Sequence, residues 1–264
     1  MGSAGITFAP GPAPGCSPIW TDGFRSSVHL ALHQVSSSIA ATIRIRQQAK
    51  SKEKKLTHGT MNFAHGYPSF SVSIGVLFRG KPAASTVIHI VEFCGGPMCW
   101  STRTISASAG GGAYCNGQKI HVSQTDNVEQ SLLVTGFGYE HDDAWTTNIN
   151  LFKEFTDISR GVRRLGSAAA DMSHVGLGIT EAYWEYRLKP WDVAAGVLIV
   201  EEAGGVVTRM DGGEFTVFDR SVLVSNGLVH GQLLDRIGPP TEDLKKKGIN
   251  FSLWFKPDSY PTDF

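Results

Sequence analysis

The chain lacks any excess of charge and any long apolar run, and both absences narrow its class. Its 24 lysines and arginines balance 24 aspartates and glutamates in 264 residues, so neither a nucleic-acid groove nor an anionic membrane surface is the expected partner. No apolar run approaches the roughly 20 residues that a membrane-spanning helix needs. With 41% hydrophobic residues the chain can still bury a sizeable core. We therefore expect a soluble globular protein with a small-molecule partner.

Cysteine is scarce and follows no metal-binding or disulfide pattern. The chain has four cysteines: Cys16, Cys94, Cys99 and Cys115. They form neither a CxxC pair nor a Cys/His ligand spacing, which disfavours both a zinc site and a disulfide framework. We expect free thiols that are mostly buried and pack as small apolar side chains.

Acidic residues are almost absent from the first 52 residues. This segment contains one acidic side chain, Asp22, together with five basic side chains and many serines and alanines. This composition is typical of an organellar transit peptide. The alternative is a tail without a targeting role, in which SSVHLALHQV could form a short amphipathic helix. The charged KSKEKK that ends at Lys55 is typical of a solvated linker. We therefore predict a tail over residues 1–55 and a folded domain over residues 56–264.

The rest of the chain predicts a mixed α/β domain. Residues 69–78 and 85–93 are rich in β-forming residues and flank the turn-forming RGKP, which indicates neighbouring antiparallel strands. Residues 110–123 hold an Asn-Gly turn before another short strand, and residues 131–138 indicate a buried strand. Residues 147–160 place Ile149, Phe152, Phe155 and Ile158 on one face of a helix. The small residues of segment 166–179 predict a closely packed helix.

Tyr183 to Val207, YWEYRLKPWDVAAGVLIVEEAGGVV, is the most informative stretch for chemistry. Asp192 precedes an apolar run that Gly204 and Gly205 end, so its carboxylate is expected at a helix N-terminus, where unpaired amides favour negative charge. On residue type alone a plain N-cap explains Asp192. Trp191 before it and the small residues after it favour a functional carboxylate.

This stretch resembles the C-terminal motif of the inositol monophosphatase family. The family's N-terminal motif, roughly Asp-Pro-Leu-Asp-Gly-Thr-Thr-Asn-Phe, matches in its second half at four positions: Gly59, Thr60, Asn62 and Phe63. HGYPSFSVSIG follows it, and RRLGSAAADM, YWEYR and VLVSN fall in the family's order and spacing. The resemblance runs from Gly59 to the C-terminus, and WFKP near the end is similar to the plant chloroplast-type branch.

The resemblance implies roles at the phosphate end of a substrate. Asp192 would hold Mg²⁺ and lie near the attacking water, which makes it both a metal ligand and a catalytic residue. Gly59 and Thr60 would offer backbone N–H groups to phosphate oxygens, and Thr60 would also orient the water. The implied reaction is an in-line displacement at phosphorus without a covalent intermediate. By residue type alone, Gly59 and Thr60 could form an ordinary turn.

The resemblance also implies further contacts to the substrate. Gly166, Ser167 and Ala168 would contact it through backbone and hydroxyl groups. Glu185 would accept hydrogen bonds from polyol hydroxyls. The bland alternatives are an N-cap for Ser167 and a surface acid for Glu185.

The first half of the N-terminal motif is missing. Counted back from Gly59, the family's two aspartates fall on Lys55 and His58, and its upstream paired glutamates have no counterpart. Of the usual metal ligands, Asp192 alone remains. At an effective dielectric near 20, one charge pair at about 4 Å is worth roughly 4 kcal/mol, so the loss of one carboxylate would weaken metal binding about a thousandfold.

Two explanations account for this break. The chain is either a degenerate relative with impaired catalysis, or its first 58 residues come from an alternative or misjoined transcript of an ordinary phosphatase gene. The break falls abruptly inside one motif while the downstream motifs match cleanly, which favours the second explanation.

The sequence therefore predicts an α/β (α+β) layered sandwich of helices and mostly antiparallel sheets, with the family's N-terminal elements missing. The expected function is Mg²⁺-dependent hydrolysis of inositol monophosphate or a similar small polyol phosphate, by a homodimer in the chloroplast or, alternatively, the cytoplasm. The competing hypothesis is a catalytically impaired or non-catalytic relative that keeps the fold for dimerisation or ligand binding.

Overall fold

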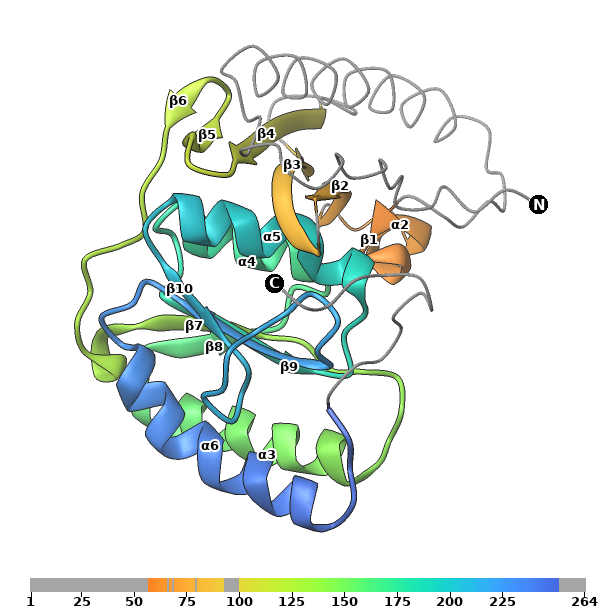
Figure 1. The fold of residues 1–264 in the computed structure, drawn as a ribbon, viewed down its shortest axis with the longest axis vertical. Coiled ribbons are helices and arrows are strands. Elements are labelled where there is room, and N and C mark those ends of the chain that lie inside the picture. The colour runs from red at the N-terminus through yellow and green to blue at the C-terminus, as the bar shows by residue number, and fades with distance from the viewer. Residues whose placement is uncertain (1–56, 66, 68, 79, 93–99, 252–264) are drawn as a thin grey trace, which may run out of the picture.

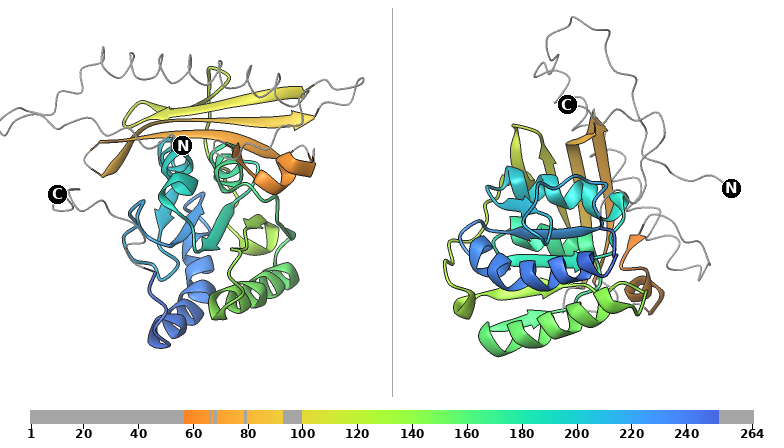
Figure 2. Two further views of the ribbon diagram at one scale, coloured as in Figure 1. Left: turned by 90° about the vertical axis from the view of Figure 1, so that its right-hand side faces the viewer. Right: turned by 60° about the horizontal axis from the view of Figure 1, so that its bottom comes forward.

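The computed structural model describes residues 57–65, 67, 69–78, 80–92 and 100–251. They form four layers in the order sheet, helices, sheet, helices (Figure 1). A side view shows the same order, with the first sheet lying across the top of the molecule (Figure 2). The predicted layered sandwich of helices and mostly antiparallel sheets is confirmed. The predicted tail lies outside the described residues, so the domain boundary stays a prediction.

The first sheet has six strands that are all antiparallel and follow chain order. Its strands are β1 (Thr57–His58), β2 (Phe70–Phe78), β3 (Lys81–Glu92), β4 (Trp100–Ser108), β5 (Gly112–Cys115) and β6 (Gln118–Lys119). The predicted pairing of β2 with β3 is confirmed, and so is the turn at Asn116-Gly117 between β5 and β6. Both turn residues have positive φ, as such a two-residue hairpin turn requires.

The second sheet has five strands in the order β10-β11-β9-β7-β8. Its strands are β7 (Leu132–Thr135), β8 (Gly161–Arg163), β9 (Ala182–Tyr186), β10 (Val206–Thr208) and β11 (Ser221–Ser225). Strand β7 runs parallel to β8 and β9, and the other pairs are antiparallel. The predicted buried strand within residues 131–138 is confirmed as β7. Strand β9 carries Glu185 and is buried over its full length.

Helices α4 (Ala168–Gly176) and α5 (Pro190–Glu202) fill the space between the two sheets. Nine of the 13 residues of α5 are buried, because sheets cover it from both sides. Glycine permits the close approaches: a Cβ at Gly75 would lie 2.9 Å from the Ala194 Cβ, and one at Gly196 would lie 2.7 Å from the Met172 Cε. The prediction of a closely packed helix is confirmed, although the helix starts at Ala168 and ends at Gly176.

Helices α3 (Asp143–Ile158) and α6 (His230–Lys246) cover the other face of the second sheet. The predicted start of the first of these helices, at residue 147, was wrong. Asp142 caps α3 with its side chain, which accepts hydrogen bonds from two amides of the first turn. The helix therefore begins four residues earlier, and its buried residues are Ala144, Asn148, Leu151 and Phe155.

Two short helices complete the described part of the chain. Helix α2 (Thr60–His65) follows Gly59, and a 3-10 turn (Val128–Gln130) precedes β7. No described helix is both long enough and apolar enough to cross a membrane.

Candidate active site

The two glycines predicted to lie at the site are in direct contact. Gly59 has a φ of +81°, and a Cβ there would lie 3.0 Å from the Ser69 carbonyl oxygen and 3.2 Å from the Gly166 carbonyl oxygen. Gly166 has a φ of +84°. Both backbone conformations favour glycine, and position 59 has no room for a side chain. The structure thus brings together two segments that are more than 100 residues apart.

Asn62 holds these two segments side by side. Its Nδ2 atom donates one hydrogen bond of 2.6 Å to the Ser69 carbonyl and another of 2.6 Å to the Leu165 carbonyl. The side chain belongs to α2, so this short helix is fixed both to the start of β2 and to the loop before α4. The sequence motif includes Asn62 but gave it no role.

Thr60, Ser167 and Ala168 follow these two glycines in the chain. Thr60 is the first residue of α2 and is exposed, whereas Ala168 is the first residue of α4. Ser167 is buried and stands at the N-cap of α4 without a capping hydrogen bond from its side chain. Its hydroxyl instead shares a hydrogen bond of 3.0 Å with the Ser71 hydroxyl of β2. The N-cap position considered for Ser167 is therefore confirmed, but its hydroxyl ties α4 to the first sheet and does not cap the helix.

Glu185 is buried on β9, so the interpretation as a surface acid was also wrong. Glu185 is only 9% exposed, and its Oε2 atom accepts a hydrogen bond from the Tyr183 hydroxyl. The two residues are two apart on a strand and so lie on one face. That face points toward the α4 and α5 layer, since Tyr183 belongs to the core cluster of these helices.

Burial and the charge of Asp192 together raise the pKa of Glu185 to about 7, against the lowering effects of the Tyr183 hydrogen bond and the Arg164 charge. Burial also raises the pKa of Tyr183 well above its ordinary value, with added repulsion from Glu185. The tyrosine therefore stays protonated and can donate to the carboxylate. Glu185 changes its charge near neutral pH.

Asp171 is a second buried carboxyl in the same layer. It lies on α4, and burial raises its pKa well above the ordinary value, with the Glu185 charge as the next cause. A backbone hydrogen bond from Ser167 and the charge of Arg164 oppose this rise. Its Oδ1 atom has no hydrogen-bond partner among the described residues. Burial between the sheets thus favours the neutral form of Asp171.

Asp192 is the third residue of α5, and Lys189 takes the N-cap position. The predicted location at a helix N-terminus is confirmed, but the plain N-cap interpretation was wrong by three positions. The Asp192 Oδ2 atom accepts a hydrogen bond of 3.0 Å from the Lys189 amide. The side chain of the third helical residue thus bonds to the backbone of the N-cap residue. Trp191, beside Asp192, is 48% exposed, so this end of α5 opens to the surface.

The described residues fit a metal ion poorly. They contain no group of three or more His, Cys, Asp or Glu side chains that could hold one. His58 lies on β1, where it pairs with Ser71 of β2, and Lys55 lies outside the described residues.

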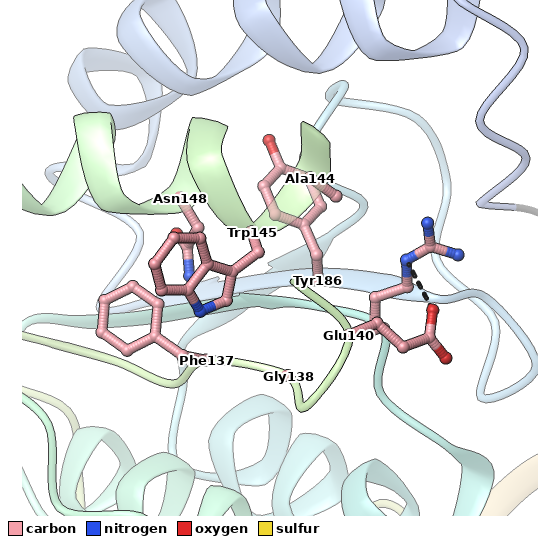
Figure 3. A pocket seen from close by; sticks show the side chains of 8 residues that line it. Phe137, Gly138, Glu140, Ala144, Trp145, Asn148 and Tyr186 are labelled. Carbon is pink, nitrogen blue, oxygen red and sulfur yellow. Dashed lines mark ion pairs between the residues drawn. The ribbon is translucent and has the colours of Figure 1, made fainter. Parts of the chain in front are cut away.

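A small pocket lies next to the Glu185 end of β9, where β7 leads into residues 136–138 (Figure 3). Its volume of about 10 Å³ is enough for a single water. Phe137 and Trp145 line its apolar side, and Glu140 pairs with Arg187 at 3.5 Å on the other. Arg187 also pairs with Asp142, the cap of α3. The pocket is too small for a polyol, and its lining residues from α3 place it on the opposite face of the second sheet from Glu185.

A larger cavity of about 410 Å³ lies near the C-terminal end of α6. Its charged lining residues are one carboxylate and two cations, since Asp211 pairs with Arg209 at 3.0 Å and with Lys245 at 2.9 Å. These hydrogen bonds hold the pKa of Asp211 at about 2, against the effect of burial. None of the predicted site residues lines this cavity.

Sequence reasoning missed four residues that shape the site: Gly136, Arg164, Asp171 and Tyr183. Two carried a visible signal. Asp171 is an acid inside a run of small apolar residues, and Tyr183 stands two positions before Glu185 on a strand. Arg164 and Gly136 carried none, because their importance comes from contacts with distant parts of the chain.

The comparison with known families decides the identity of this fold. The profile described as the inositol monophosphatase family matches residues 58–245. The chain belongs to the inositol monophosphatase family. That match begins at His58, one residue before Gly59, and it includes every predicted site residue. Members of this family are generally metal-dependent phosphatases.

Individual relatives agree with this assignment. The chain is 77% identical over 205 residues to a protein named "Phosphatase IMPL1, chloroplastic" from Arabidopsis thaliana, covering 78% of this chain and 54% of that protein. The chain thus spans about half the length of that relative. The solved inositol monophosphatase from Anabaena (Nostoc) sp. PCC 7120 has 39% identity and a TM-score of 0.61, covering 69% of this chain and 68% of that one. The inositol monophosphate-bound SaIMPase-II has 29% identity and a TM-score of 0.58, covering 73% of each chain.

Proposed function

We propose that the chain is a Mg²⁺-dependent phosphomonoesterase that hydrolyses inositol monophosphate or a similar small polyol phosphate to the free alcohol and phosphate. One observation carries the proposal: Gly59 lies against Gly166, while Glu185 and Asp192 lie close enough for their charges to interact. These residues come from separate segments of the region that matches the family. The inositol monophosphate bound to SaIMPase-II, a structure with 29% identity to this chain, supports the substrate class.

The proposed chemistry assigns the phosphate to the glycine contact and the alcohol to Glu185. The backbone N–H groups of Gly59 and Thr60 would donate to phosphate oxygens, and the exposed Thr60 hydroxyl would orient a water for in-line attack. The water oxygen forms the new bond to phosphorus, the ester bond breaks, and the alcohol leaves with a proton. Gly166, Ser167 and Ala168 would contact the substrate mainly through the backbone, because the Ser167 hydroxyl is already bonded to Ser71.

Ionised Glu185 would accept hydrogen bonds from the polyol hydroxyls. Tyr183 fixes its orientation by donating to Oε2, which leaves the other carboxylate oxygen for the ligand. Since burial raises the pKa of Glu185 to about 7, this acceptor is fully charged only above neutral pH. We therefore expect substrate binding to strengthen as the pH rises through 7.

We include Mg²⁺ in the proposal because members of the family are generally metal-dependent. Asp192 is the residue that would hold the ion. Its fit to the described residues is poor, because they supply no cluster of acids around Asp192. We expect turnover to be low for the same reason.

This shortage of acids favours a second candidate function, which is ligand binding without efficient catalysis. A polyol phosphate needs the backbone donors and Glu185 for binding, and these are present. Hydrolysis in this family additionally needs metal ligands, which the described residues do not assemble. The two candidates differ in whether bound substrate is turned over.

Phosphate release from inositol 1-phosphate at millimolar Mg²⁺ tests the proposal. Glu185→Gln and Asp192→Asn should each lower the rate of the parent chain at least tenfold, whereas the exposed control Glu129→Gln should leave it unchanged. A parent rate that neither site variant lowers would contradict the assigned site. Calorimetric binding of inositol 1-phosphate without phosphate release would establish the second candidate instead.

Location and assembly belong to the same proposal. We propose a plastid location, supported by the chloroplastic relative at 77% identity and by the acid-poor first 52 residues. A homodimer rests on the family resemblance, and light scattering of the purified chain at micromolar concentration would measure its mass directly.

A further inference from the structure

Arg164 lies beside the glycine contact of the candidate site. It directly follows β8 and stands two residues before Gly166. Its Nη1 atom lies 3.8 Å from the position that a Cβ at Gly166 would take, and the Asn62 Nδ2 lies 3.3 Å from the same position. Gly59 faces the carbonyl oxygen of Gly166. The guanidinium therefore borders the place where the phosphate is expected.

The Arg164 side chain is exposed and forms no hydrogen bond or ion pair with any residue that the structure describes. Three other arginines of the described chain pair with carboxylates: Arg187 with Glu140, Arg209 with Asp211 and Arg236 with Glu154. The charge of Arg164 still reaches the site, because it acts to lower the pKa values of Asp171 and Glu185 against their burial. An unpaired cation thus stands at the edge of a pair of buried carboxyls.

The chemistry of a guanidinium suits a phosphate group. Its planar fork donates two parallel hydrogen bonds to a phosphate, and these charge-assisted bonds are roughly twice as strong as neutral ones. Glu185 and Asp171 are too buried to satisfy the exposed guanidinium, and neither forms a hydrogen bond to it. Because the described residues assemble no metal cluster, a side-chain cation gains importance for holding a dianion.

We propose that Arg164 binds the phosphate group of the substrate, donating to its oxygens beside Gly59 and Gly166 while Glu185 receives the polyol hydroxyls. The ligand class rests on the proposed function, but the binding itself requires neither a metal nor turnover. Arg164 thereby adds a phosphate-binding side chain to a site that otherwise uses backbone donors.

The neighbouring Arg163 provides a matched control. Both arginines are exposed, so replacing either one removes the same charge from the same surface. The Arg163 guanidinium, however, lies over Gly161, where its Nη1 atom is 3.0 Å from the position of a Cβ, and donates a 3.3 Å hydrogen bond to the Val162 carbonyl. Neither of these two contacts involves a predicted site residue.

Titration calorimetry of inorganic phosphate into the full chain, with EDTA to remove metal ions, tests this proposal. Arg164→Gln should weaken the Kd at least tenfold, Arg164→Lys should give an intermediate loss, and Arg163→Gln should stay within twofold of the parent. Thermal unfolding of each variant should show a Tm within about 2 °C of the parent, because an exposed side chain is replaced.

Three results would overturn the assignment: no phosphate binding by the parent, an unchanged Kd for Arg164→Gln, or equal losses for both arginine variants, which would indicate net charge alone. Failure of the proposed function would look different. If phosphate binding depends on Arg164 but inositol 1-phosphate is not hydrolysed, the assignment of Arg164 is supported and the proposed phosphatase activity is refuted.

Discussion

A Cβ atom at Gly136 would overlap the carboxylate of Glu185. Gly136 directly follows β7, which runs parallel to β9 with Thr135 opposite Trp184, so positions 136 and 185 are neighbours at the same end of the two strands. Asn148 of α3 donates a 2.6 Å hydrogen bond to the Gly136 carbonyl and accepts a 2.7 Å bond from the Trp184 indole. The position of Glu185 is thus fixed from three sides, by Gly136, by its own strand and by Tyr183.

Gly136→Ala should therefore displace the Glu185 carboxylate and weaken polyol recognition. We expect the KM for inositol 1-phosphate to rise at least fivefold, while the KM for p-nitrophenyl phosphate, which has no hydroxyls for Glu185, should change less than twofold. Gly138→Ala is the control, because a Cβ there would lie at an ordinary 3.4 Å from the Arg187 Cβ. Equal KM changes for both substrates would show that the substitution disturbs the fold and not the Glu185 contact.

A second prediction concerns the histidine pair between β3 and α4. The rings of His89 and His174 meet edge to face at 5.0 Å between centroids. Burial lowers the pKa of His89 to about 4, with added repulsion from His174 and Arg103, and burial likewise lowers the pKa of His174 to about 4, with repulsion from Arg103. In the unfolded chain both rings should titrate near 6.5.

The free energy of unfolding should therefore lose the contribution of these rings as the pH falls from 6.5 to about 4, because the unfolded chain binds protons there that the folded chain excludes. At about 1.4 kcal/mol per pKa unit, the loss is about 3 kcal/mol per ring at most, and less for the two together since part of each shift is mutual. The rise in the pKa of Glu185 acts in the opposite direction, so the comparison needs variants. Urea unfolding between pH 7 and 4.5 should show a shallower pH dependence for His89→Gln than for the parent or the exposed control His121→Gln. Identical slopes would refute the buried neutral pair.

Some elements of this fold follow from local sequence patterns, whereas others depend on packing between distant segments. The β2–β3 hairpin and the buried α5 follow from alternation and apolar runs within about 25 residues, so the sequence predicts them. Helix α6 was missed because it contains Pro239 and Pro240, which remove amide donors and normally indicate a turn. Its apolar side chains Leu233 and Ile237 pack on the second sheet, and this tertiary burial outweighs the local preference.

The residues of the candidate site also divide into those that sequence motifs predict and those that only the structure shows. Motif spacing was enough to select Gly59, Glu185 and Asp192, because the family resemblance assigns these positions directly. It could not select Arg164, whose importance lies in the distance from its guanidinium to Gly166 and in its lack of a carboxylate partner. Such properties arise only when α2, β8 and the start of α4 are placed together.

The third prediction concerns the first 52 residues, which lie outside the described part of the chain. Their shortage of acids predicts plastid import, so a fusion of residues 1–52 to a fluorescent protein should colocalise with chlorophyll in leaf cells. A fusion with Arg44 and Arg46 replaced by glutamate should remain diffuse, because acidic residues are depleted from transit peptides. A diffuse cytosolic signal from the unchanged fusion would show that this segment is a tail without a targeting role.

The fourth prediction asks whether Asp192 is a metal ligand or only part of the start of α5. If the two aspartates of the family motif correspond to Lys55 and His58, then Lys55→Asp with His58→Asp should partly rebuild an anionic cluster and raise the affinity for Mg²⁺ or Mn²⁺. We expect a gain of about tenfold, well short of a complete site, because the upstream glutamates would still be missing and a hard six-coordinate ion tolerates little misplacement. Calorimetric titration of the parent and the double variant measures this gain.

Adding Asp192→Asn to the double variant separates the two roles. A carboxylate that shares one ion with positions 55 and 58 makes the gain disappear when it becomes an amide, since the three side chains then act on a single bound charge. If Asp192 is purely structural, the gain in metal affinity stays intact. An asparagine oxygen can still accept the hydrogen bond from the Lys189 amide, so the Tm should change by less than about 2 °C. If the double variant binds no more tightly than the parent, the alignment of Lys55 and His58 with the family's aspartates is wrong. The segment before Gly59 would then be foreign to the domain, and the chain would bind phosphate through the Gly59, Gly166 and Arg164 side of the site alone.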